Sequence, residues 1–354
     1  MSTEEKNHEM LSDIFDIPSV IRTIYQNYVE KKNPELTIAA SLLGKRNPII
    51  FSGMVTSEYS AYPASIVLSQ GGILNCVVEA AELLHYHRPI LNDPSCLVAV
   101  SQSGESGEIV QLLEKAHGNV PVVGVYNDDK SFLAKNSNVG LPIFAGQPHA
   151  CGTKTNVASI AVLLLLAEAV ISKNIKFSGK LLLNIAEHID SLLAGWESLL
   201  MPACEFLADA QDIIFIGRGP GLCSAKFSSV LFRETVKCVS EGFSAATFRH
   251  GPLEMVKPEH RVVIFAPMGC TYDLCIKLAM RLMDFSVPVM VVTDRDSPLH
   301  NEKGLLVMKT GFGLDLYSPV VDIVPFQLIG FQLAKWKGFT PGKLEKAEYI
   351  TRNE

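Results

Sequence analysis

The chain has 354 residues, of which 48% are hydrophobic and 19% charged, and its formal net charge is −6. This composition is globular and core-rich, which excludes an intrinsically disordered chain, and the length predicts two domains. The acidic balance and the lack of a Lys/Arg-rich run argue against a nucleic-acid partner. An anionic ligand would therefore be held by local donors.

The eight cysteines show neither a CxxC pair nor a Cys/His metal spacing, so we expect no metal. The closest two are Cys270 and Cys275, without a neighbouring histidine. Residues 1–5 are acidic and lack an apolar signal core. The longest apolar run, Val157 to Ile171, is interrupted by Glu168, and we interpret it as a core helix too short to span a bilayer. These features predict a cytoplasmic protein without a membrane partner.

The N-terminal part is polar and carries one amphipathic helix, roughly Ile17 to Glu30, with Asp16 and Pro18 at its entrance. From Pro48 to about residue 335, short apolar strands alternate with helical stretches. Continuous apolar strands separated by helices indicate a parallel sheet covered on both faces. The fold class is therefore α/β.

This alternation occurs twice, about 165 residues apart, which indicates a duplicated α/β domain. The matching strand patterns are Ile49–Gly53 with Ile213–Gly217, Leu97–Val100 with Val262–Phe265, and Val120–Val125 with Val287–Val292. Both members of the last pair end in turns rich in Asn and Asp, at 127–129 and 294–296. The predicted organisation is an N-terminal helical segment 1–34, a first α/β domain 35–173, a helical linker 174–208, a second α/β domain 209–335 and a C-terminal tail 336–354.

A serine-rich turn, Ser101-Gln102-Ser103-Gly104-Glu105-Ser106-Gly107, joins a predicted strand to a helical pattern that continues through Leu113. The first N–H groups of a helix lack intrahelical partners, and the helix dipole favours negative charge there. Serines add hydroxyl donors, and glycines let a ligand approach the backbone. The turn therefore predicts an anion site, and a plain N-cap at Ser103 or Ser106 is the alternative.

The equivalent turn in the second half, Ala266 to Thr271, has too few hydroxyls to hold a phosphate. We therefore expect only the first half to bind phosphate, and the second half to supply catalytic groups.

The serine-rich turn resembles the phosphate-binding signature of the sugar isomerase (SIS) domain. That domain forms the isomerase half of glucosamine-6-phosphate synthase and occurs in fructosamine/glucoselysine-6-phosphate deglycases and amino-sugar-phosphate deaminases. The resemblance covers about residues 35–354. It implies two tandem flavodoxin-like SIS domains, each a mostly parallel sheet with helices on both faces. It also implies that the phosphate is bound by Ser101, Gln102, Ser103 and Ser106.

Two further segments are similar to the sugar-contacting loops of this family. Thr56 and Ser57 follow a predicted strand, and Gly152 and Thr153 lie in the segment Cys151-Gly152-Thr153-Lys154-Thr155, before the apolar helix. In both places a capped helix start is the alternative. Gly152 replaces the family's usual Ser, and Gln147 stands where the synthase has a Glu, so the synthase's particular amino-sugar contacts are not carried over.

The resemblance also implies three catalytic residues. Glu234 precedes the string His250-Gly251-Pro252-Leu253 by the family's distance and matches the proton-shuttling base, while His250 would assist ring opening. Lys346 matches the lysine that the tail delivers to the active site, with Lys343 as the other candidate. From the residues alone, a solvated Glu, a structural loop His and a solvating tail Lys remain the alternatives.

The resemblance thus implies a phosphosugar isomerase-type enzyme that moves a proton between C1 and C2 of a phosphorylated amino sugar or sugar–amine adduct, without metal or organic cofactor. The alternatives are an isomerising glutamine–fructose-6-phosphate aminotransferase-like protein without its glutaminase domain, and a sugar-phosphate-binding regulatory module. The family's shared sites imply a homodimer, or a dimer of dimers. In this chain the loop after Val239, with Gly242, Phe243 and Phe248, is the segment expected to mediate sharing.

Overall fold

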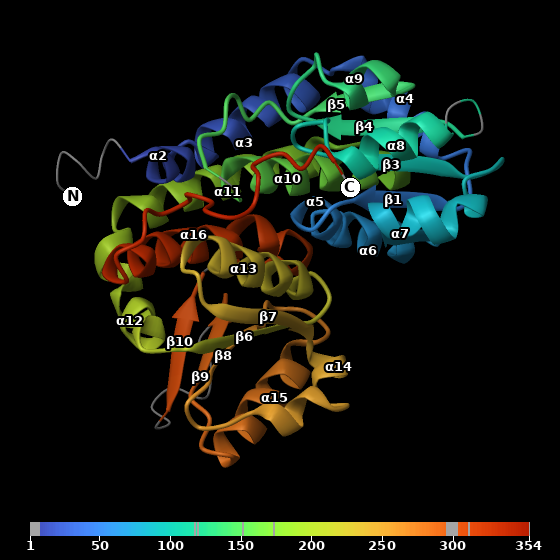
Figure 1. The fold of residues 1–354 in the computed structure, drawn as a ribbon. Coiled ribbons are helices and arrows are strands. Elements are labelled where there is room, and N and C mark those ends of the chain that lie inside the picture. Colours follow the sequence, from blue (N-terminus) through green and yellow to red (C-terminus); the bar gives the residue numbers. More distant parts are fainter. Residues whose placement is uncertain are drawn as a thin grey trace. The chain divides into compact units, whose positions relative to one another are not determined.

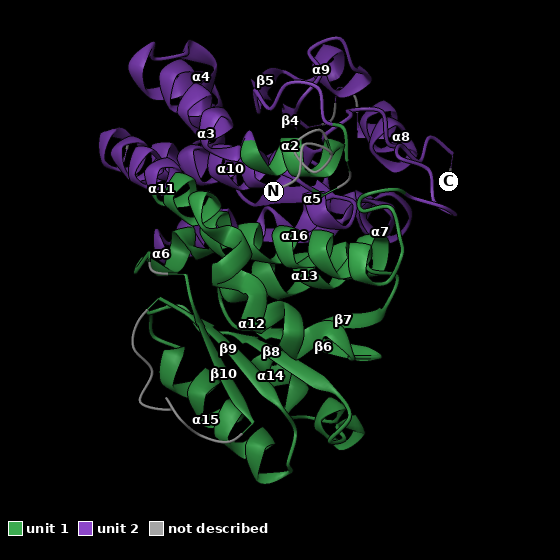
Figure 2. Cartoon of the chain, turned by 90° about the vertical axis from the view of Figure 1, so that its left-hand side faces the viewer, with its two compact units in different colours: residues 1–15, 149–152, 188–343 green, residues 16–148, 153–187, 344–354 purple. Residues whose placement is uncertain are grey.

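The structure is a computed structural model that describes residues 8–353 apart from 117, 119, 151, 173, 295–303 and 311. Residues 1–5, Cys151 and positions 295–296 of the second Asp-rich turn therefore lie outside the described residues. Two compact units make up the chain (Figure 2). Unit 1 holds residues 1–15, 149–152 and 188–343, and unit 2 holds residues 16–148, 153–187 and 344–354.

Unit 2 is built on a five-stranded parallel sheet in the order β2-β1-β3-β4-β5 (Figure 1). Its strands are β1 Ile49–Gly53, β2 Asn75–Glu79, β3 Cys96–Val100, β4 Val122–Tyr126 and β5 Val139–Pro142. Its helices are α3 Ile17–Tyr25, α4 Pro34–Leu43, α5 Thr56–Tyr59, α6 Tyr62–Gln70, α7 Ala80–Glu82, α8 Gly107–Ala116, α9 Phe132–Asn136 and α10 Lys154–Ser172, with π-helical turns η1 Gln26–Glu30 and η2 Leu83–His87 and the 3-10 turn η3 Arg88–Ile90.

Unit 1 has a second five-stranded parallel sheet, in the order β10-β9-β8-β6-β7. Its strands are β6 Asp212–Gly217, β7 Val239–Ser244, β8 Arg261–Phe265, β9 Val289–Thr293 and β10 Leu305–Lys309. Its helices are α2 Glu9–Phe15, α12 Trp196–Ala208, α13 Gly221–Thr235, α14 Ala245–Phe248, α15 Tyr272–Asp284 and α16 Ser318–Trp336, with the 3-10 turns η4 Pro252–Met255 and η5 Asp315–Tyr317. Helix α11, Lys176–Ala194, crosses the boundary between the units.

The two sheets have the same topology, which confirms the predicted duplication. Read from β2 and from β7, each sheet has its second strand at the edge, then its first, third, fourth and fifth. The three strands matched between the halves occupy equivalent central positions. The α/β fold with two tandem flavodoxin-like domains is therefore confirmed.

The central strands are almost entirely apolar, as expected of strands whose two faces are covered by helices. In unit 2 every residue of β1, β3 and β4 is buried. Ile50, Leu97 and Ala99 pack in one cluster with Ile109 and Leu112 of α8. Burying side chains of this size stabilises the unit by roughly 1.5–3 kcal/mol each.

Helix α10 contains the long apolar run and is mostly buried, as expected of a core helix. However, α10 and the helical segment 315–336 are each long enough and apolar enough to cross a membrane, judged by length and composition alone. The expectation that the apolar run is too short to span a bilayer was therefore wrong. Of the apolar windows in these two segments, 72% and 89% respectively are buried inside the protein. Burial, not length, identifies them as core helices.

The predicted helix from Ile17 to Glu30 is confirmed, as α3 continued by the π-helical turn η1, although Asp16 at its N-cap position makes no side-chain capping bond. Two local expectations need correction. The N-terminal part carries a further helix, α2, where only a polar start was predicted. The predicted loop after Val239 is the edge strand β7, whose half-buried residues lack a long apolar run. Gly242 is required within it, because a Cβ there would lie 2.8 Å from the Ala225 carbonyl oxygen in α13.

Candidate active site

Two hydroxyl-bearing loops leave the sheet of unit 2 side by side. Strands β1 and β3 are parallel neighbours, and their last residues, Gly53 and Val100, are paired in register. Thr56 and Ser57 lie in the first turn of α5, just beyond β1, and the serine-rich turn follows β3. Ligands of open α/β sheets bind at this carboxyl edge. The structure thus brings both predicted sugar-phosphate segments of unit 2 to one edge.

The serine-rich turn is organised by its own hydroxyls. The Gly104 N–H donates to Ser101 Oγ at 3.1 Å, and the Glu105 N–H donates to Ser103 Oγ at 3.2 Å. Ser101 Oγ and Ser106 Oγ lie 3.3 Å apart. Ser101 is buried, whereas Ser103 and Ser106 are half-buried. The turn therefore presents the two outer serines towards solvent and uses the inner one as a brace.

The same turn is held from the side by the segment that begins α9. Gly104 has φ +66°, and a Cβ there would lie 2.2 Å from Ser131 Oγ, so only glycine fits. Glu105 Oε1 accepts the Phe132 N–H at 2.7 Å, and the Gly104 carbonyl accepts the Leu133 N–H at 3.1 Å. These contacts fix the turn in advance of any ligand, a prerequisite for tight anion binding.

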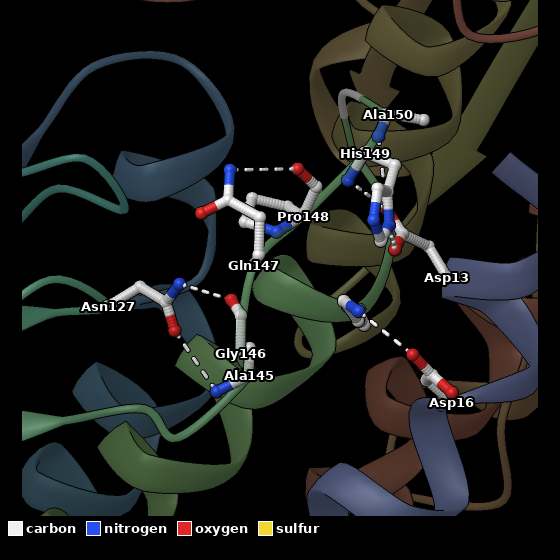
Figure 3. Close-up of polar contacts among 10 residues, drawn as sticks. Asp13, Asp16, Asn127, Ala145, Gly146, Gln147, Pro148, His149 and Ala150 are labelled. Carbon is white, nitrogen blue, oxygen red and sulfur yellow. Dashed lines mark hydrogen bonds and ion pairs between the residues drawn. The ribbon is translucent and has the colours of Figure 1, made fainter. Parts of the chain in front are cut away.

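Asn127, at the end of β4, connects the serine-rich turn to the chain after β5. Its N–H donates to the Gln102 carbonyl at 3.0 Å. Its side chain accepts from the Ala145 N–H at 3.0 Å and donates to the Gly146 carbonyl at 2.7 Å (Figure 3). The sequence pattern predicts for this position only a place in an Asn/Asp-rich turn. Its role depends on segments far apart in the chain, which no local pattern reveals.

The C-terminal tail lies on the start of α8. The Gly107 N–H donates to the Thr351 carbonyl at 3.0 Å, and a Cβ on Gly107 would lie 2.7 Å from the Arg352 carbonyl. One of the helix-start donors expected to face an anion is thus occupied by the chain itself. Lys346, in the same tail, is exposed.

The segment 149–154 is anchored at both ends (Figure 3). In unit 1, Asp13 accepts from the His149 and Ala150 N–H groups at 2.8 and 3.0 Å. The Gly152 carbonyl accepts Gln327 Nε2 at 3.0 Å, and Gly152 has φ +68°. In unit 2, Thr153 is fully buried, and Lys154 Nζ pairs with Asp16 at 2.9 Å. The Asp16 side chain is thus engaged in an ion pair and makes no capping bond to α3.

Glu234 lies in the last turn of α13 in unit 1. Burial raises the pKa of its carboxyl group, an effect opposed by the nearby charges of Arg233 and Lys237. Lys237, with φ +58°, donates from Nζ to the carbonyls of Glu234 and Lys343, at 2.5 and 2.8 Å. The structure therefore brings the backbone of Lys343, where the tail begins, beside Glu234.

His250 is exposed and follows α14. Its N–H donates to the Thr247 carbonyl at 2.9 Å, and Gly251 next to it has φ +138°, a conformation that favours glycine. Helix α13 returns from the carboxyl edge of the sheet to the amino edge, so Glu234 lies near the start of β7 and His250 beyond its end. The six residues of β7 span roughly 20 Å. Within one chain these two residues are not brought together.

No group of three or more His, Cys, Asp or Glu side chains is arranged to hold a metal ion within the part of the chain that the structure describes. Asp294, just beyond β9, acts electrostatically on two other acids of unit 1, Asp315 and Asp322. Burial, and the charge of Asp294, raise the pKa of Asp315, and burial raises the pKa of Asp322 to about 7.

The family model described as the SIS domain matches residues 42–169 and 206–310. The chain belongs to the SIS domain family. The two matches fall on the two parallel sheets, one in each unit, and the resemblance inferred from the serine-rich turn is confirmed.

Curated relatives of this SIS protein include the isomerizing glutamine–fructose-6-phosphate aminotransferases of Pyrococcus horikoshii and Thermococcus kodakarensis. The first is 29% identical over 343 residues and the second 26% identical over 346 residues. Each match covers 95% of this chain and 56% of the relative. The SIS protein thus spans just over half the length of these relatives.

Solved structures with the same fold include the C-terminal domain of glucosamine-fructose-6-phosphate aminotransferase from Francisella tularensis, with 21% identity and a TM-score of 0.83, which covers 97% of this chain and 100% of that one. A tagatose-6-phosphate ketose/aldose isomerase from Escherichia coli has 18% identity and a TM-score of 0.80, with 98% and 99% coverage. A glucosamine-6-phosphate deaminase from Thermotoga maritima has 20% identity and a TM-score of 0.74, with 97% and 99% coverage. At these identities the likeness shows the fold.

Proposed function

We propose that this SIS protein is a cytoplasmic phosphosugar isomerase-type enzyme that acts on a phosphorylated amino sugar or sugar–amine adduct. The observation that carries the proposal is the braced serine-rich turn beside a second hydroxyl-bearing loop, at the carboxyl edge of the unit 2 sheet. The names of its relatives and structural neighbours point the same way, since they refer to fructose, glucosamine and tagatose 6-phosphates.

In the proposed reaction, the substrate is bound mainly by residues of unit 2. Its phosphate accepts hydrogen bonds from Ser101, Ser103 and Ser106, from the Gln102 side chain and from amides at the start of α8. The sugar hydroxyls meet Thr56 and Ser57 and the Gly152–Thr153 backbone. Neutral donors suit this task because the chain carries a formal charge of −6 and offers no general attraction to anions.

The proton transfer is assigned to unit 1. Glu234 takes the proton from one of the carbons C1 and C2 and returns it to the other, and such a positioned base contributes roughly 10²–10⁴ in rate. Its half-buried position, which raises its pKa, brings the carboxyl group closer to the range where it can both accept and release a proton. His250 assists ring opening. Lys346 forms an iminium at a ketose carbonyl or stabilises the developing oxyanion, with Lys343 as the alternative.

The positions of Glu234 and His250 support a site shared between two copies. Because they lie at opposite edges of one sheet, both can serve one substrate only if His250 comes from a second subunit. We therefore propose a homodimer, the commonest closed assembly. Mixing the inactive variants Glu234→Gln and His250→Ala should restore activity, since a mixed dimer contains one site with both residues. If the two variants exchange subunits but no activity is recovered, a site shared between two copies is ruled out.

Isotope exchange tests the reaction itself. The protein is incubated in deuterated water with fructose 6-phosphate, glucosamine 6-phosphate or a fructosamine 6-phosphate, and the C1 and C2 hydrogens are followed by NMR. An isomerase-type enzyme exchanges one of these hydrogens, and released ammonia or amine identifies a deaminase or deglycase. Binding of sugar phosphates without exchange or product would instead favour a regulatory module.

The second candidate is an isomerizing aminotransferase, favoured by the names of the relatives with 26–29% identity. Gln147 stands where the synthase has a Glu, and it is exposed. Formation of glucosamine 6-phosphate from fructose 6-phosphate and ammonium would support this candidate. Exchange with fructose 6-phosphate but no amination at high ammonium would count against it.

A further inference from the structure

Unit 2 contains a cavity that the proposed reaction does not use. It has a volume of about 610 Å³ and lies where η1 and α4 meet the end of α10 and the start of α11. Ala169 and Val170, which line it, are separated from Thr153 by about 25 Å of helix at 1.5 Å per residue. The cavity is therefore remote from the segment predicted to contact the sugar. Its size is typical of sites for small molecules.

The floor of the cavity is apolar and well packed. Leu36 and Tyr28 are almost fully buried, and Ala169 and Val170 are buried from the other side. The Tyr28 hydroxyl donates to the Pro142 carbonyl at 2.8 Å, so the polar end of this ring is satisfied away from the cavity. The floor thus offers only apolar contacts, which suit a hydrocarbon body.

The rim of the cavity is positive. Three lysines line it, Lys32, Lys45 and Lys176, and all three are exposed. Among the described residues of the lining there is no Asp or Glu to neutralise them. The other polar lining residues are neutral hydroxyls and amides, including Thr37 and Ser41. In a chain of net charge −6, this excess of positive charge around an apolar hollow selects for an anion.

The backbone fixes the rim in an unusual conformation. Tyr28 and Val29 belong to the π-helical turn η1, and Lys32 just beyond it has φ +55°, which is uncommon for a residue with a side chain. Asn33 then caps α4 by accepting the Glu35 N–H at 2.8 Å, and Asn174 accepts the Lys176 N–H at 3.1 Å. Strained positions of this kind are concentrated at binding sites.

From these features we infer a second ligand site in unit 2, for an amphipathic anion with a carboxylate or phosphate head and an apolar body. The body occupies the floor formed by Tyr28, Leu36 and Val170, and the head meets the lysines of the rim. This site does not depend on the proposed reaction.

Calorimetry with dodecanoate, kept below its micellar concentration, tests the inference on the full-length protein. We expect saturable binding of one dodecanoate per chain. Dodecyltrimethylammonium, which has the same tail and the opposite charge, and inorganic phosphate, which has no tail, should not compete for it. Equally tight binding of dodecyltrimethylammonium would overturn the inference, because the lysines would then not favour an anion over a cation.

Variants locate the bound anion. Replacing Lys32, Lys45 and Lys176 together by Gln should weaken dodecanoate binding at least about tenfold, while Lys180→Gln, an exposed neighbour outside the lining, should leave it unchanged. Thr37→Trp, from an exposed lining position, should fill the cavity and abolish binding, whereas Ile38→Trp beside it should not.

Three results would contradict the site. One is unchanged affinity in the Lys32/Lys45/Lys176 variant or in Thr37→Trp. Another is loss of dodecanoate binding in Ser106→Ala, which would place the anion on the serine-rich turn. The third is a change of oligomeric state on sedimentation of the lysine variant, which would make this surface an interface between copies. Failure of the proposed sugar-phosphate reaction would leave this site untouched.

Discussion

The two sheets share one topology and differ in the charge at their carboxyl edges. In unit 2 the loop after the third strand carries the neutral hydroxyls of Ser101, Ser103 and Ser106, and the buried Lys154 that begins helix α10 is paired with Asp16. In unit 1 the corresponding loop packs against an acid, because a Cβ on Gly269 would lie 2.0 Å from Asp315 Oδ2. The duplicated framework itself thus favours neither anions nor cations, and the loops at the carboxyl edge decide which charge can bind.

The same comparison extends to the turns after the fourth strands. Asn127 bridges neighbouring segments through an amide, whereas Asp294 holds the Met268 N–H at 3.1 Å through a carboxylate. Helix α16 adds a buried acid, Asp322, in its second turn. A phosphate at the unit 1 edge would face carboxylates, which supports the expectation that only unit 2 binds one.

The largest expected effect concerns Asp322. Its pKa is raised to about 7 from an ordinary value of 3.8, first because of burial, so the folded state holds the proton more tightly than the unfolded state. The stabilisation that comes from this tighter proton binding is fully present below about pH 4 and is lost as the pH rises towards 7. Over that window the free energy of unfolding falls by about 1.4 kcal/mol per pH unit. Asp322→Asn should remove this slope and stabilise the protein at neutral pH. Denaturant titrations from pH 4 to 8 measure it, and an unchanged slope would contradict the assignment.

Glu234→Gln separates binding in unit 2 from chemistry in unit 1. The amide keeps the shape but removes the base, so turnover should fall about 10²-fold or more while sugar-phosphate affinity is retained. Hydrogen–deuterium exchange at C1 or C2 should be lost to the same extent. Glu205→Gln, an exposed position on α12, is the control. Wild-type exchange rates in Glu234→Gln would remove this residue from the mechanism.

Gly104→Ala tests how rigidly the serine-rich turn is held. The positive φ and the contact with Ser131 should together cost about 2–3 kcal/mol of unfolding free energy. Gly72→Ala is the matched control, since its φ is +76° but nothing lies within 4 Å of the added Cβ, and it should cost about 1 kcal/mol. Equal losses in chemical denaturation would show that the close approach to Ser131 contributes nothing.

Ser106→Ala and Thr271→Ala compare the two helix starts directly. Ser106 precedes α8 and Thr271 precedes α15 at the equivalent place in unit 1. Losing a hydrogen bond to phosphate should weaken sugar-phosphate binding by about 1.5 kcal/mol, roughly tenfold, in Ser106→Ala alone. Calorimetry measures both variants. An equal loss in Thr271→Ala, or none in Ser106→Ala, would contradict the assignment of phosphate to unit 2.

The central strands and the serine-rich turn could be predicted because their signals are local. A strand covered on both faces is apolar at every position, as in Leu97–Val100, and a strand-to-helix turn rich in Ser and Gly is visible in a few consecutive residues. The edge strands gave no such signal. The strand β7 is only partly buried, and Gly242 is there for a contact with α13 that lies outside the local pattern.

The sequence by itself determined the duplicated α/β fold and the family, since both rest on residue types at short spacings. Tertiary structure alone decided how the candidate site is assembled. Hydrogen bonds join Gly107 to Thr351 and Asn127 to Gly146. Lys237 donates to the carbonyls of both Glu234 and Lys343. The number of residues between the partners differs from one bond to the next. Such hydrogen bonds form between groups that folding brings together, so they leave no periodic trace in the sequence. The separation of Glu234 from His250 along β7 likewise follows from the direction of a helix and a strand, which only the folded sheet fixes.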